Sequence, residues 1–507
     1  MRKDVLIIGG GATGAGIVRD LALRGVECAL LEMGDYCHGA SGGNHGLLHS
    51  GGRYAVTDPP SATECAKENA ILRRTAPFCI EGTDGLFVSL PGDDPSFADP
   101  FLKGCKGSGV PAEELTAKEA LSAEPGLSAE ALRCIAVQDG SIDPFALVQA
   151  NVDSAREAGA MVRNHCRVTD MVLEGGMVVR VKAFDRRSGE ILTIVPEIVI
   201  NAAGAWAPQV AAMAGCEVAM GLDQGSMLVA DGRLCGHVVN RLRPPSDGDI
   251  AVPNHTATVL GTTSRPAASP EDVAPSHDDM ELLLRETSAM LPALRHCRVV
   301  RAYGGVRPLP GRGGRGASRT FSLITDERAG NLLSVVGGKL TTYRLMAERV
   351  SDQVCNALGV RAGCRTRTEP LGPPVDEAGG SVTLARLRRK YGFKAGAVSL
   401  ADQRMLCSCE QVLRAEAQMV LAGPDALTLS DVMRRTRAGM GYCQGLDCAL
   451  SLQELMMEAG GTEPLASLTE FLEERERGQA LASGDQLRQE VLRRHVLQGV
   501  YGLGERE

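Results

Sequence analysis

The first 32 residues alternate between short apolar runs and one segment with helical spacing. Val5–Ile8 is an apolar run that ends at the glycine-rich stretch Gly9–Gly14. Ala15–Arg24 follows with apolar residues three and four positions apart, and a second apolar run, Cys28–Leu31, ends at Glu32. Short apolar runs of this kind predict buried strands, and a helix between two strands makes a βαβ unit. This pattern predicts an α/β fold with a parallel sheet.

Strand-like and helix-like stretches continue to alternate between about residues 60 and 330, without a clean break. The segment Ile198–Cys216 carries no charge and could be mistaken for a membrane span. Asn201, Pro208 and Gln209 interrupt it, and a span needs about 20 mainly apolar residues. We therefore interpret this segment as a buried strand, a turn and a helix. Met1–Asp4 leads directly into the first strand and lacks the features of a signal peptide.

The composition is that of a globular protein with several domains. A chain of 507 residues is too long for one ordinary core, so we expect two to four domains. The net charge of −8 argues against a nucleic-acid partner, because binding phosphates requires a basic surface. Most of the 16 cysteines are isolated in sequence, which fits reduced thiols in the cytoplasm.

The glycine-rich stretch after the first strand has the spacing of a dinucleotide site. Gly9, Gly11 and Gly14 form G-x-G-x-x-G between a predicted strand and helix. Their roles are a tight turn, close approach of the backbone to a pyrophosphate, and helix–strand packing. Glu32 lies 18 residues after Gly14, where it can accept hydrogen bonds from a ribose hydroxyl. The pattern predicts NAD or FAD binding but does not distinguish the two cofactors.

Four cysteines near the C-terminus are organised in two close pairs. Cys407 and Cys409 form C-x-C, and Cys443 and Cys448 form C-x₄-C. Two pairs brought together by a fold make a four-sulfur site, which suits zinc or an iron–sulfur cluster. Zinc sites usually space their pairs as C-x₂₋₄-C, from which C-x-C departs. Structural zinc, a [2Fe–2S] cluster and unbound thiols are the alternatives.

Several longer motifs resemble those of the FAD-dependent glycerol-3-phosphate dehydrogenases, and above all the large catalytic component of the anaerobic enzyme, its A subunit. The N-terminal motifs DVLIIGGGATGAGIVRDLALRG and GASGGNHGLLHSGGRYAVTD lie within residues 4–58. Further matches are DGSIDPF at 139–145, INAAGAW at 200–206, RAYGGVRPL at 301–309 and GGKLTTYR at 337–344. The cysteine region resembles the bacterioferritin-associated-ferredoxin-like [2Fe–2S] domain, and the resemblance covers nearly the whole chain.

This resemblance implies a domain organisation. We expect a Rossmann-like FAD-binding domain interleaved with an α+β substrate domain, followed by a small helical four-cysteine module. The expected FAD-dependent oxidoreductase spans 1–365, with FAD-binding pieces at about 1–60, 145–215 and 330–360. A linker at 366–400, a [2Fe–2S]-binding module at 401–455 and a helical tail at 456–507 complete the chain.

The resemblance also assigns the site residues. Those expected to bind FAD are Gly9, Gly11, Gly14, Glu32, Ser41, Ala203, Gly204, Gly338, Leu340 and Thr341. Those expected to bind the substrate are Arg53, Tyr54 and Arg319, since a phosphomonoester needs convergent cations. The four cysteines Cys407, Cys409, Cys443 and Cys448 would hold a [2Fe–2S] cluster that relays single electrons.

Three residues are expected to take part in catalysis: His49, Arg307 and Lys339. Oxidation of a secondary alcohol moves a hydride to the flavin while a base accepts the hydroxyl proton. Histidine suits this role because its pKa lies near neutrality. His49 is therefore expected to be the base or to orient the hydroxyl; alternatively it is structural, and Arg307 polarises the hydroxyl.

The expected activity is oxidation of sn-glycerol 3-phosphate to dihydroxyacetone phosphate, with electrons passing to quinone. The resemblance implies two partners, a second flavoprotein subunit together with a membrane-anchoring iron–sulfur subunit. It also implies a cytoplasmic protein attached peripherally to the inner face of the cytoplasmic membrane through a partner.

Two positions depart from the family's pattern. Gln224 stands where lysine is common, and Gly43 stands where arginine is usual. Both changes remove positive charge near the expected site, so substrate identity is less secure than cofactor identity. The alternatives are a related dehydrogenase of a 2-hydroxy acid or an amino acid, a non-catalytic electron-transfer subunit that holds FAD and the cluster, and a zinc scaffold.

Overall fold

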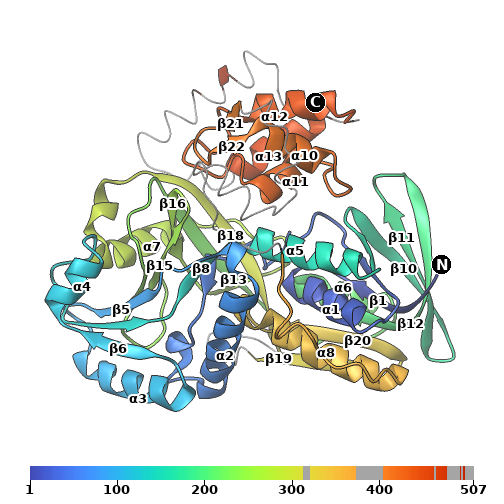
Figure 1. Cartoon of the computed structure of the whole chain (residues 1–507), viewed down its shortest axis with the longest axis horizontal. Helices are drawn as coiled ribbons and strands as arrows, with labels where there is room; N and C mark the ends of the chain where they lie inside the picture. Colours follow the sequence, from blue (N-terminus) through green and yellow to red (C-terminus); the bar gives the residue numbers. More distant parts are fainter. Residues whose placement is uncertain (312–319, 373–403, 462–463, 477–491, 493–494, 497–507) are drawn as a thin grey trace.

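A computed structural model gives the fold, and the structure describes residues 1–311, 320–372, 404–461, 464–476, 492 and 495–496. Within these ranges the chain forms two large sheets and a small C-terminal unit (Figure 1). The greater part of the predicted linker and of the predicted tail lies outside the described residues, as does Arg319.

The first large sheet contains the predicted βαβ unit. Its parallel strands lie in the order β9-β2-β1-β12-β20, and β19 adds to β20 in the antiparallel sense. The first half of β12 also pairs antiparallel with β11, which pairs with β10. The strands are β1 (Arg2–Ile8), β2 (Cys28–Leu31), β9 (Met161–Arg163), β10 (Cys166–Glu174), β11 (Met177–Asp185), β12 (Glu190–Asn201), β19 (Phe321–Asp326) and β20 (Ala329–Gly337).

Both faces of this sheet are covered. Helices α1 (Ala12–Leu23), α5 (Pro144–Glu157) and α8 (Tyr343–Leu358) lie side by side on one face (Figure 1). The antiparallel extension β10–β11 and helix α6 (Ala207–Ala212) cover the other. Successive side chains of a strand point to opposite faces. Val5 and Ile7 accordingly belong to the helical core, whereas Leu6 and Ile8 belong to the core beneath the extension.

The uncharged segment at 198–216 has the conformation that its sequence predicts. The end of β12 is buried, a turn and a short 3₁₀ helix follow, and α6 completes the segment. No helix among the described residues is long and apolar enough to cross a membrane.

The second large sheet has nine strands, and helix α7 (His277–Met290) packs against one of its faces. Its order is β17-β13-β16-β15-β14-β5-β7-β6, and β18 pairs with β13 along almost its whole length. The strands are β5 (Gly85–Ser89), β6 (Ala112–Leu115), β7 (Arg133–Val137), β13 (Met220–Ala230), β14 (Val238–Arg241), β15 (Ile250–Asn254), β16 (Ala257–Gly261), β17 (Arg265–Pro266) and β18 (Val299–Pro310).

Shorter elements connect the two sheets. A three-stranded sheet joins β3 (Leu47–Leu48), β8 (Gly140–Ile142) and β4 (Ile80–Glu81). The remaining α-helices before residue 372 are α2 (Pro59–Thr75), α3 (Ala98–Ser108) and α4 (Ala117–Ala123). The 3₁₀ helices are η1 (Gly52–Tyr54), η2 (Pro77–Cys79), η3 (Pro95–Phe97), η4 (Gly204–Trp206), η5 (Pro292–His296) and η6 (Leu340–Thr342).

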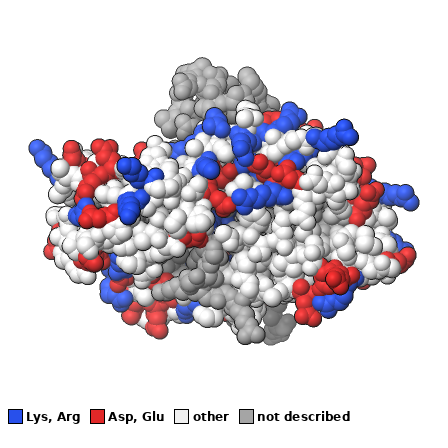
Figure 2. Space-filling model, turned by 90° about the horizontal axis from the view of Figure 1, so that it is seen from below, with Lys and Arg blue, Asp and Glu red and all other residues white. Residues whose placement is uncertain are grey.

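The C-terminal unit is small and mainly helical, with its own apolar core. A short hairpin of β21 (Met405–Cys407) and β22 (Val412–Leu413) precedes four helices. These are α10 (Arg414–Leu421), α11 (Leu429–Thr436), α12 (Ala449–Glu458) and α13 (Pro464–Glu476). In Figure 1 the unit lies above both sheets, with α11 next to α5. On the face seen from below, Figure 2 shows acidic and basic side chains interspersed.

Candidate active site and four-cysteine cluster

An elongated cavity of about 430 Å³ joins the predicted dinucleotide motif to the predicted catalytic residues. Gly9, Gly11 and Glu32 line one end, where β1 and β2 finish. His49 and Lys339 line the other end. The cavity lies at the carboxyl ends of parallel strands, where open α/β sheets bind their ligands.

The glycines of the motif allow backbone segments to approach one another closely. Gly9 has a φ of +111°, and a Cβ on it would lie 2.5 Å from the carbonyl oxygen of Ala202. A Cβ on Gly14 would lie 1.9 Å from the carbonyl oxygen of Gly9. Gly14 therefore fixes how α1 packs on β1 and does not itself line the cavity.

Glu32 is tied to the backbone around the motif. Its carboxylate accepts hydrogen bonds from the backbone N–H of Gly10 at 2.6 Å and of Gly34 at 2.8 Å. Ser41 lines the same cavity, and its hydroxyl accepts a hydrogen bond from Ala12 N at 2.9 Å. The two residues join the loop after β2 to the start of α1, so the cradle for a dinucleotide is already formed.

Two glycine turns complete the walls between the ends of the cavity. Ala203 and Gly204 follow β12, and Gly338 and Leu340 follow β20; all four line the cavity. Thr341 lies just behind this lining, and its hydroxyl accepts a hydrogen bond from the backbone N–H of His49 at 3.1 Å. The turn after β20 leads through η6 into helix α8.

Three predicted residues meet at the catalytic end of the cavity. The rings of His49 and Tyr54 lie 5.4 Å apart, centroid to centroid. Lys339 Nζ lies 4.7 Å from the centroid of the Tyr54 ring and donates a hydrogen bond to Ser61 Oγ at 2.9 Å. The ammonium group over the aromatic face is a favourable cation–π arrangement. His45 also lines this end, with its ring 6.1 Å from that of His49.

Arg307 is held in place by a carboxylate that the sequence did not single out. Its Nη1 forms an ion pair with Asp223, which lies opposite it in the β13–β18 register. Its Nη2 donates to Thr262 Oγ1 at 2.7 Å and to Thr263 O at 3.0 Å. Asp223 in turn accepts a hydrogen bond from Ser264 Oγ at 2.7 Å. The guanidinium therefore reaches the cavity in a fixed orientation.

Arg53 lies beside the catalytic end but is not part of the cavity lining. Its Nη2 donates to the carbonyl oxygen of Ser246 at 3.0 Å and pairs with the buried carboxylate of Asp249 at 3.2 Å. It neighbours Tyr54 within η1, but its guanidinium group is bound to Ser246 and Asp249 and does not line the cavity.

The two departures from the family's pattern have structural explanations. Gln224 lies on β13 and does not line the cavity; its amide donates to Ala274 O at 2.8 Å and accepts from Arg265 at 3.0 Å. Gly43 packs against β18, where a Cβ on Gly43 would lie 3.0 Å from Gly305 Cα. A side chain at position 43 would therefore need β18 to shift by a few tenths of an ångström, which glycine avoids.

Two further residues that the sequence analysis did not single out line the cavity. Trp206 and Glu271 line the cavity, and Trp206 Nε1 donates to Glu271 Oε1 at 2.7 Å. Trp206 belongs to the INAAGAW motif, so this motif could have identified it. Glu271 belongs to no motif and reaches the cavity only because its loop folds back over η4.

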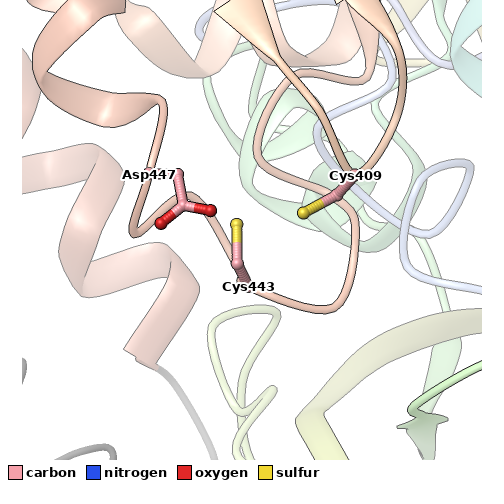
Figure 3. A group of neighbouring side chains, drawn as sticks. All are labelled: Cys409, Cys443 and Asp447. Atoms are coloured by element: carbon pink, nitrogen blue, oxygen red, sulfur yellow. The ribbon is translucent and has the colours of Figure 1, made fainter.

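The structure brings together the four predicted cysteines in the C-terminal unit. Cys407 and Cys448 are hydrogen-bonded through their thiols, which lowers the pKa of Cys407 to about 6 and raises that of Cys448. The thiols of Cys409 and Cys443 interact in the same way, and burial together with this contact raises the pKa of Cys443 to about 12. Figure 3 shows the Cys443 side chain between the Cys409 sulfur, which points towards it, and the Asp447 carboxylate.

A dense polar interface attaches this unit to the first sheet. Asp35, three residues after Glu32, pairs with Arg435 at 2.8 Å and with Arg434 at 3.4 Å. Although burial opposes ionisation, the two guanidinium groups hold the pKa of Asp35 below its usual range. Asp425 pairs similarly with Arg156 of α5 at 2.5 Å. The unit therefore contacts the loop that carries part of the dinucleotide cradle.

Known proteins share both the sequence and the fold. A family model described as FAD dependent oxidoreductase matches residues 4–344. The A1 subunit of the anaerobic glycerol-3-phosphate dehydrogenase of Haloferax volcanii is 42% identical, covering 98% of this chain and 90% of that protein. The A subunit of the Escherichia coli enzyme is 40% identical, covering 99% and 97%.

A solved structure agrees with these sequence matches. The glycerol-3-phosphate dehydrogenase of Bacillus halodurans, complexed with FAD, superposes with a TM-score of 0.68 at 25% identity. The match covers 97% of this chain and 95% of that one.

The glycine cradle, the placed Glu32 and the cavity between two sheets define an FAD-binding oxidoreductase of mixed α/β fold, as the sequence predicted. Within this class, the chain belongs to the family formed by the A subunits of anaerobic glycerol-3-phosphate dehydrogenases.

Proposed function

We propose that the chain is the catalytic subunit of an sn-glycerol-3-phosphate:quinone oxidoreductase, which oxidises glycerol 3-phosphate to dihydroxyacetone phosphate. The continuous cavity, which joins the dinucleotide cradle at Gly9 and Glu32 to His49, Arg307 and Lys339, carries this proposal. Dehydrogenation needs the cofactor and the groups that handle the alcohol in one continuous space.

The residues around the cavity fit FAD. The glycine cradle would admit a pyrophosphate, and Glu32, directly after β2, would accept a hydrogen bond from a ribose hydroxyl. Ser41, Ala203, Gly204, Gly338 and Leu340 line the space between the two ends. When bound, FAD supplies the hydride acceptor.

The protein's own residues would handle the proton and the charge of the substrate. His49 is the proposed base, or the group that orients the hydroxyl. Arg307, fixed by Asp223, would polarise the substrate oxygen. Lys339 would add positive charge beside Tyr54.

The phosphate of the substrate requires cations at the same end of the cavity. Arg53 and Tyr54 adjoin it on η1, and Arg319 is expected to join them. The guanidinium of Arg53 pairs with Asp249, so binding the phosphate would require Arg53 to share or exchange this partner.

We also propose that Cys407, Cys409, Cys443 and Cys448 hold a [2Fe–2S] cluster. Their thiols approach one another in pairs, which is the donor set that such a cluster needs. The cluster supplies a one-electron relay between a two-electron flavin and a partner. The proposed partners are a second flavoprotein subunit together with a membrane-anchoring iron–sulfur subunit, and quinone is the final acceptor.

Anaerobic titration of the purified chain with sn-glycerol 3-phosphate tests the activity. The flavin absorbance is expected to bleach with this substrate and to stay unchanged with glycerol or 2-hydroxyglutarate. Bleaching by 2-hydroxyglutarate or by an amino acid would instead favour a related dehydrogenase. A flavin that stays oxidised with every substrate would favour a non-catalytic electron-transfer role.

Metal analysis tests the cluster separately. Two iron atoms and two acid-labile sulfides per chain are expected, with an electron paramagnetic resonance signal after reduction. One zinc atom in their place would contradict the cluster and leave the flavin chemistry intact.

A further inference from the structure

The charged side chains of the C-terminal unit are divided between a docked side and an exposed side. Arg434, Arg435 and Arg437 all point towards the rest of the chain: Arg435 pairs with Asp35, and Arg437 Nη2 donates to Asn254 at 2.8 Å. These arginines are therefore bound to groups of the same chain and do not offer their charge to a partner protein.

The exposed side has the opposite character. Between residues 404 and 461, the exposed charged residues are three acids, Asp447, Glu454 and Glu458, and one base, Arg404. Arg414 lies between Glu454 and Glu458, and its own side chain is only 12% exposed. An approaching protein would therefore meet mainly carboxylates.

Large apolar side chains are also exposed on the C-terminal unit. Tyr442 is 50% exposed and Leu446 is 44% exposed, and they flank Cys443 in the loop before α12. Met405, two residues before Cys407, and Met457, between the acids of α12, are exposed to a similar extent. Exposed apolar residues gathered at one place indicate an interaction site more strongly than scattered ones do.

The apolar residues lie directly against the cysteines. Tyr442 directly precedes Cys443, and the backbone N–H of Leu446 donates a hydrogen bond to the carbonyl oxygen of Cys443 at 3.1 Å. Cys443 is itself partly exposed, and Figure 3 shows it between Cys409 and Asp447. A protein that covered Tyr442 and Leu446 would therefore come close to the cluster.

We propose that Tyr442, Leu446, Met405 and Met457, with the rim of Asp447, Glu454 and Glu458, form the exit face, where an electron-accepting redox protein docks. The partner would present an apolar area around its own cofactor, ringed by lysine and arginine. This inference rests on the proposed cluster and not on the identity of the substrate. Transient electron-transfer complexes have small interfaces, and opposite charges on the two proteins speed their association.

Reduction of two probe proteins with opposite charge tests the exit face. The purified holoenzyme is reduced with dithionite, the excess is removed, and the chain is mixed with mitochondrial cytochrome c, which is basic, or plastocyanin, which is acidic. Each haem or copper ion gains one electron, and the chain loses one for each probe molecule. Since dithionite replaces the substrate, failure of glycerol 3-phosphate to reduce the flavin would leave this test unaffected.

Charge reversal should exchange the preference between the probes. In the double variant Glu454→Lys/Glu458→Lys, cytochrome c reduction should fall about tenfold at low ionic strength, and plastocyanin reduction should rise. The difference should shrink at high salt. Leu446→Ser should slow both probes, and the turnover of a small dye should not change in any of these variants.

Matched controls lie on other exposed parts of the chain. Ile191→Ser, at a residue 58% exposed on β12, and Glu217→Lys, at a carboxylate 86% exposed, should leave both probe rates unchanged. Equal rates for the wild type and the exit-face variants, or equal slowing by the controls, would overturn the proposal. A purified chain without iron would overturn it as well. The rise with plastocyanin cannot result from misfolding, so the test does not depend on loss of activity alone.

Discussion

His49 occupies a position in which its backbone is fixed and its ring is directed by neighbours. Its N–H donates to Thr341 Oγ1 at 3.1 Å, and its ring lies against Tyr54. Substitution His49→Asn keeps a hydrogen-bonding side chain but removes the base. We expect kcat to fall by about 10²- to 10⁴-fold, with unchanged flavin content, in steady-state assays with glycerol 3-phosphate and a dye.

The exposed His277 offers a control for this substitution. Its side chain is 65% exposed and pairs with Glu281 within α7. His277→Asn should retain wild-type kcat. A His49→Asn enzyme that kept more than half of the wild-type kcat would make His49 structural and give its role to Arg307.

Asp223 acts on the reaction through Arg307. Substitution Asp223→Asn preserves the shape of the side chain but removes its charge, so the guanidinium loses its strongest partner. Hydrogen bonds to charged groups contribute about 1.5–3 kcal/mol, so kcat/KM should fall by about 10- to 100-fold. Flavin reduction measured by stopped flow should show the loss, whereas Asp326→Asn, in the partly exposed pair with Arg328, should have no effect.

A structural role alone would predict a different result for Asp223→Asn. It would lower thermal stability and leave kcat/KM of the remaining folded enzyme unchanged. Recovery of activity in Asp223→Glu, which restores the charge, would distinguish orientation of Arg307 from general stabilisation.

Residues close together in sequence were predictable, and partners far apart were not. Gly9, Gly14 and Glu32 follow from local spacing, because one βαβ unit contains them all. Asp223 and Arg307 are 84 residues apart and meet only through the β13–β18 register. A single carboxylate outside any motif carries no signal in one sequence.

The loop between β2 and β3 connects two sites that lie at opposite ends of the sequence. It carries Glu32 and Ser41 for the dinucleotide cradle and Asp35 for the C-terminal unit. The hydrophobic pattern predicted the strands on either side of the cradle. It could not predict this loop's second contact, because that contact depends on arginines 400 residues later in the chain.

Substitution Asp35→Asn should loosen the C-terminal unit. Removing one partner of a buried ion pair costs about 3–5 kcal/mol, because the other charge stays buried. Hydrogen exchange in α11 should become faster, and the chain should bind FAD less tightly because the cradle loop loses its anchor. Glu174→Gln, in an exposed pair with Arg180, is the matched control and should change neither property.

The ion pair between Asp35 and the arginines of α11 also predicts how the stability of the folded chain depends on pH. The pKa of Asp35 is lowered in the folded chain, so its contribution to stability is present above its ordinary pKa of about 3.9. The contribution is lost as the pH falls below that value. The difference in free energy of unfolding between the wild type and Asp35→Asn, measured with denaturant, should therefore be constant from pH 7 to pH 4 and shrink below pH 4. A difference that grew on acidification would contradict this assignment.

At the scale of elements, strand β12 could be predicted from the hydrophobic pattern only in part. Its second half is a buried parallel strand, as the apolar run at 198–200 predicts. Its first half belongs to the antiparallel extension with β11 and alternates between exposed and buried residues. The sequence shows both patterns, but nothing in it indicates that they form one continuous strand.

At the scale of the whole molecule, the flavin cavity and the cysteine cluster are separate sites within one chain. Cys443→Ser should reduce iron content to near zero while leaving bound flavin unchanged. Glycerol 3-phosphate should still bleach the flavin, but electron transfer to a protein acceptor should fall at least tenfold. Anaerobic flavin reduction and acceptor reduction, measured on the same preparation, check both parts.

Cys297→Ser supplies the control, since Cys297 is partly exposed and lies far from the cluster in sequence. This variant should retain both iron and electron transfer. Loss of flavin bleaching in Cys443→Ser would show instead that the cluster is needed for the first chemical step.

The cavity walls come from segments spread along the chain, and the last of them, residues 335–343, begins at the end of β20. During synthesis, β1 leaves the ribosome long before its neighbour β12, and β20 can join the sheet only after about two thirds of the chain has been made. The cofactor therefore cannot be captured as its glycine motif emerges. Nascent chains that stall before residue 337 should bind no flavin, and the supply of free cofactor matters only late in translation.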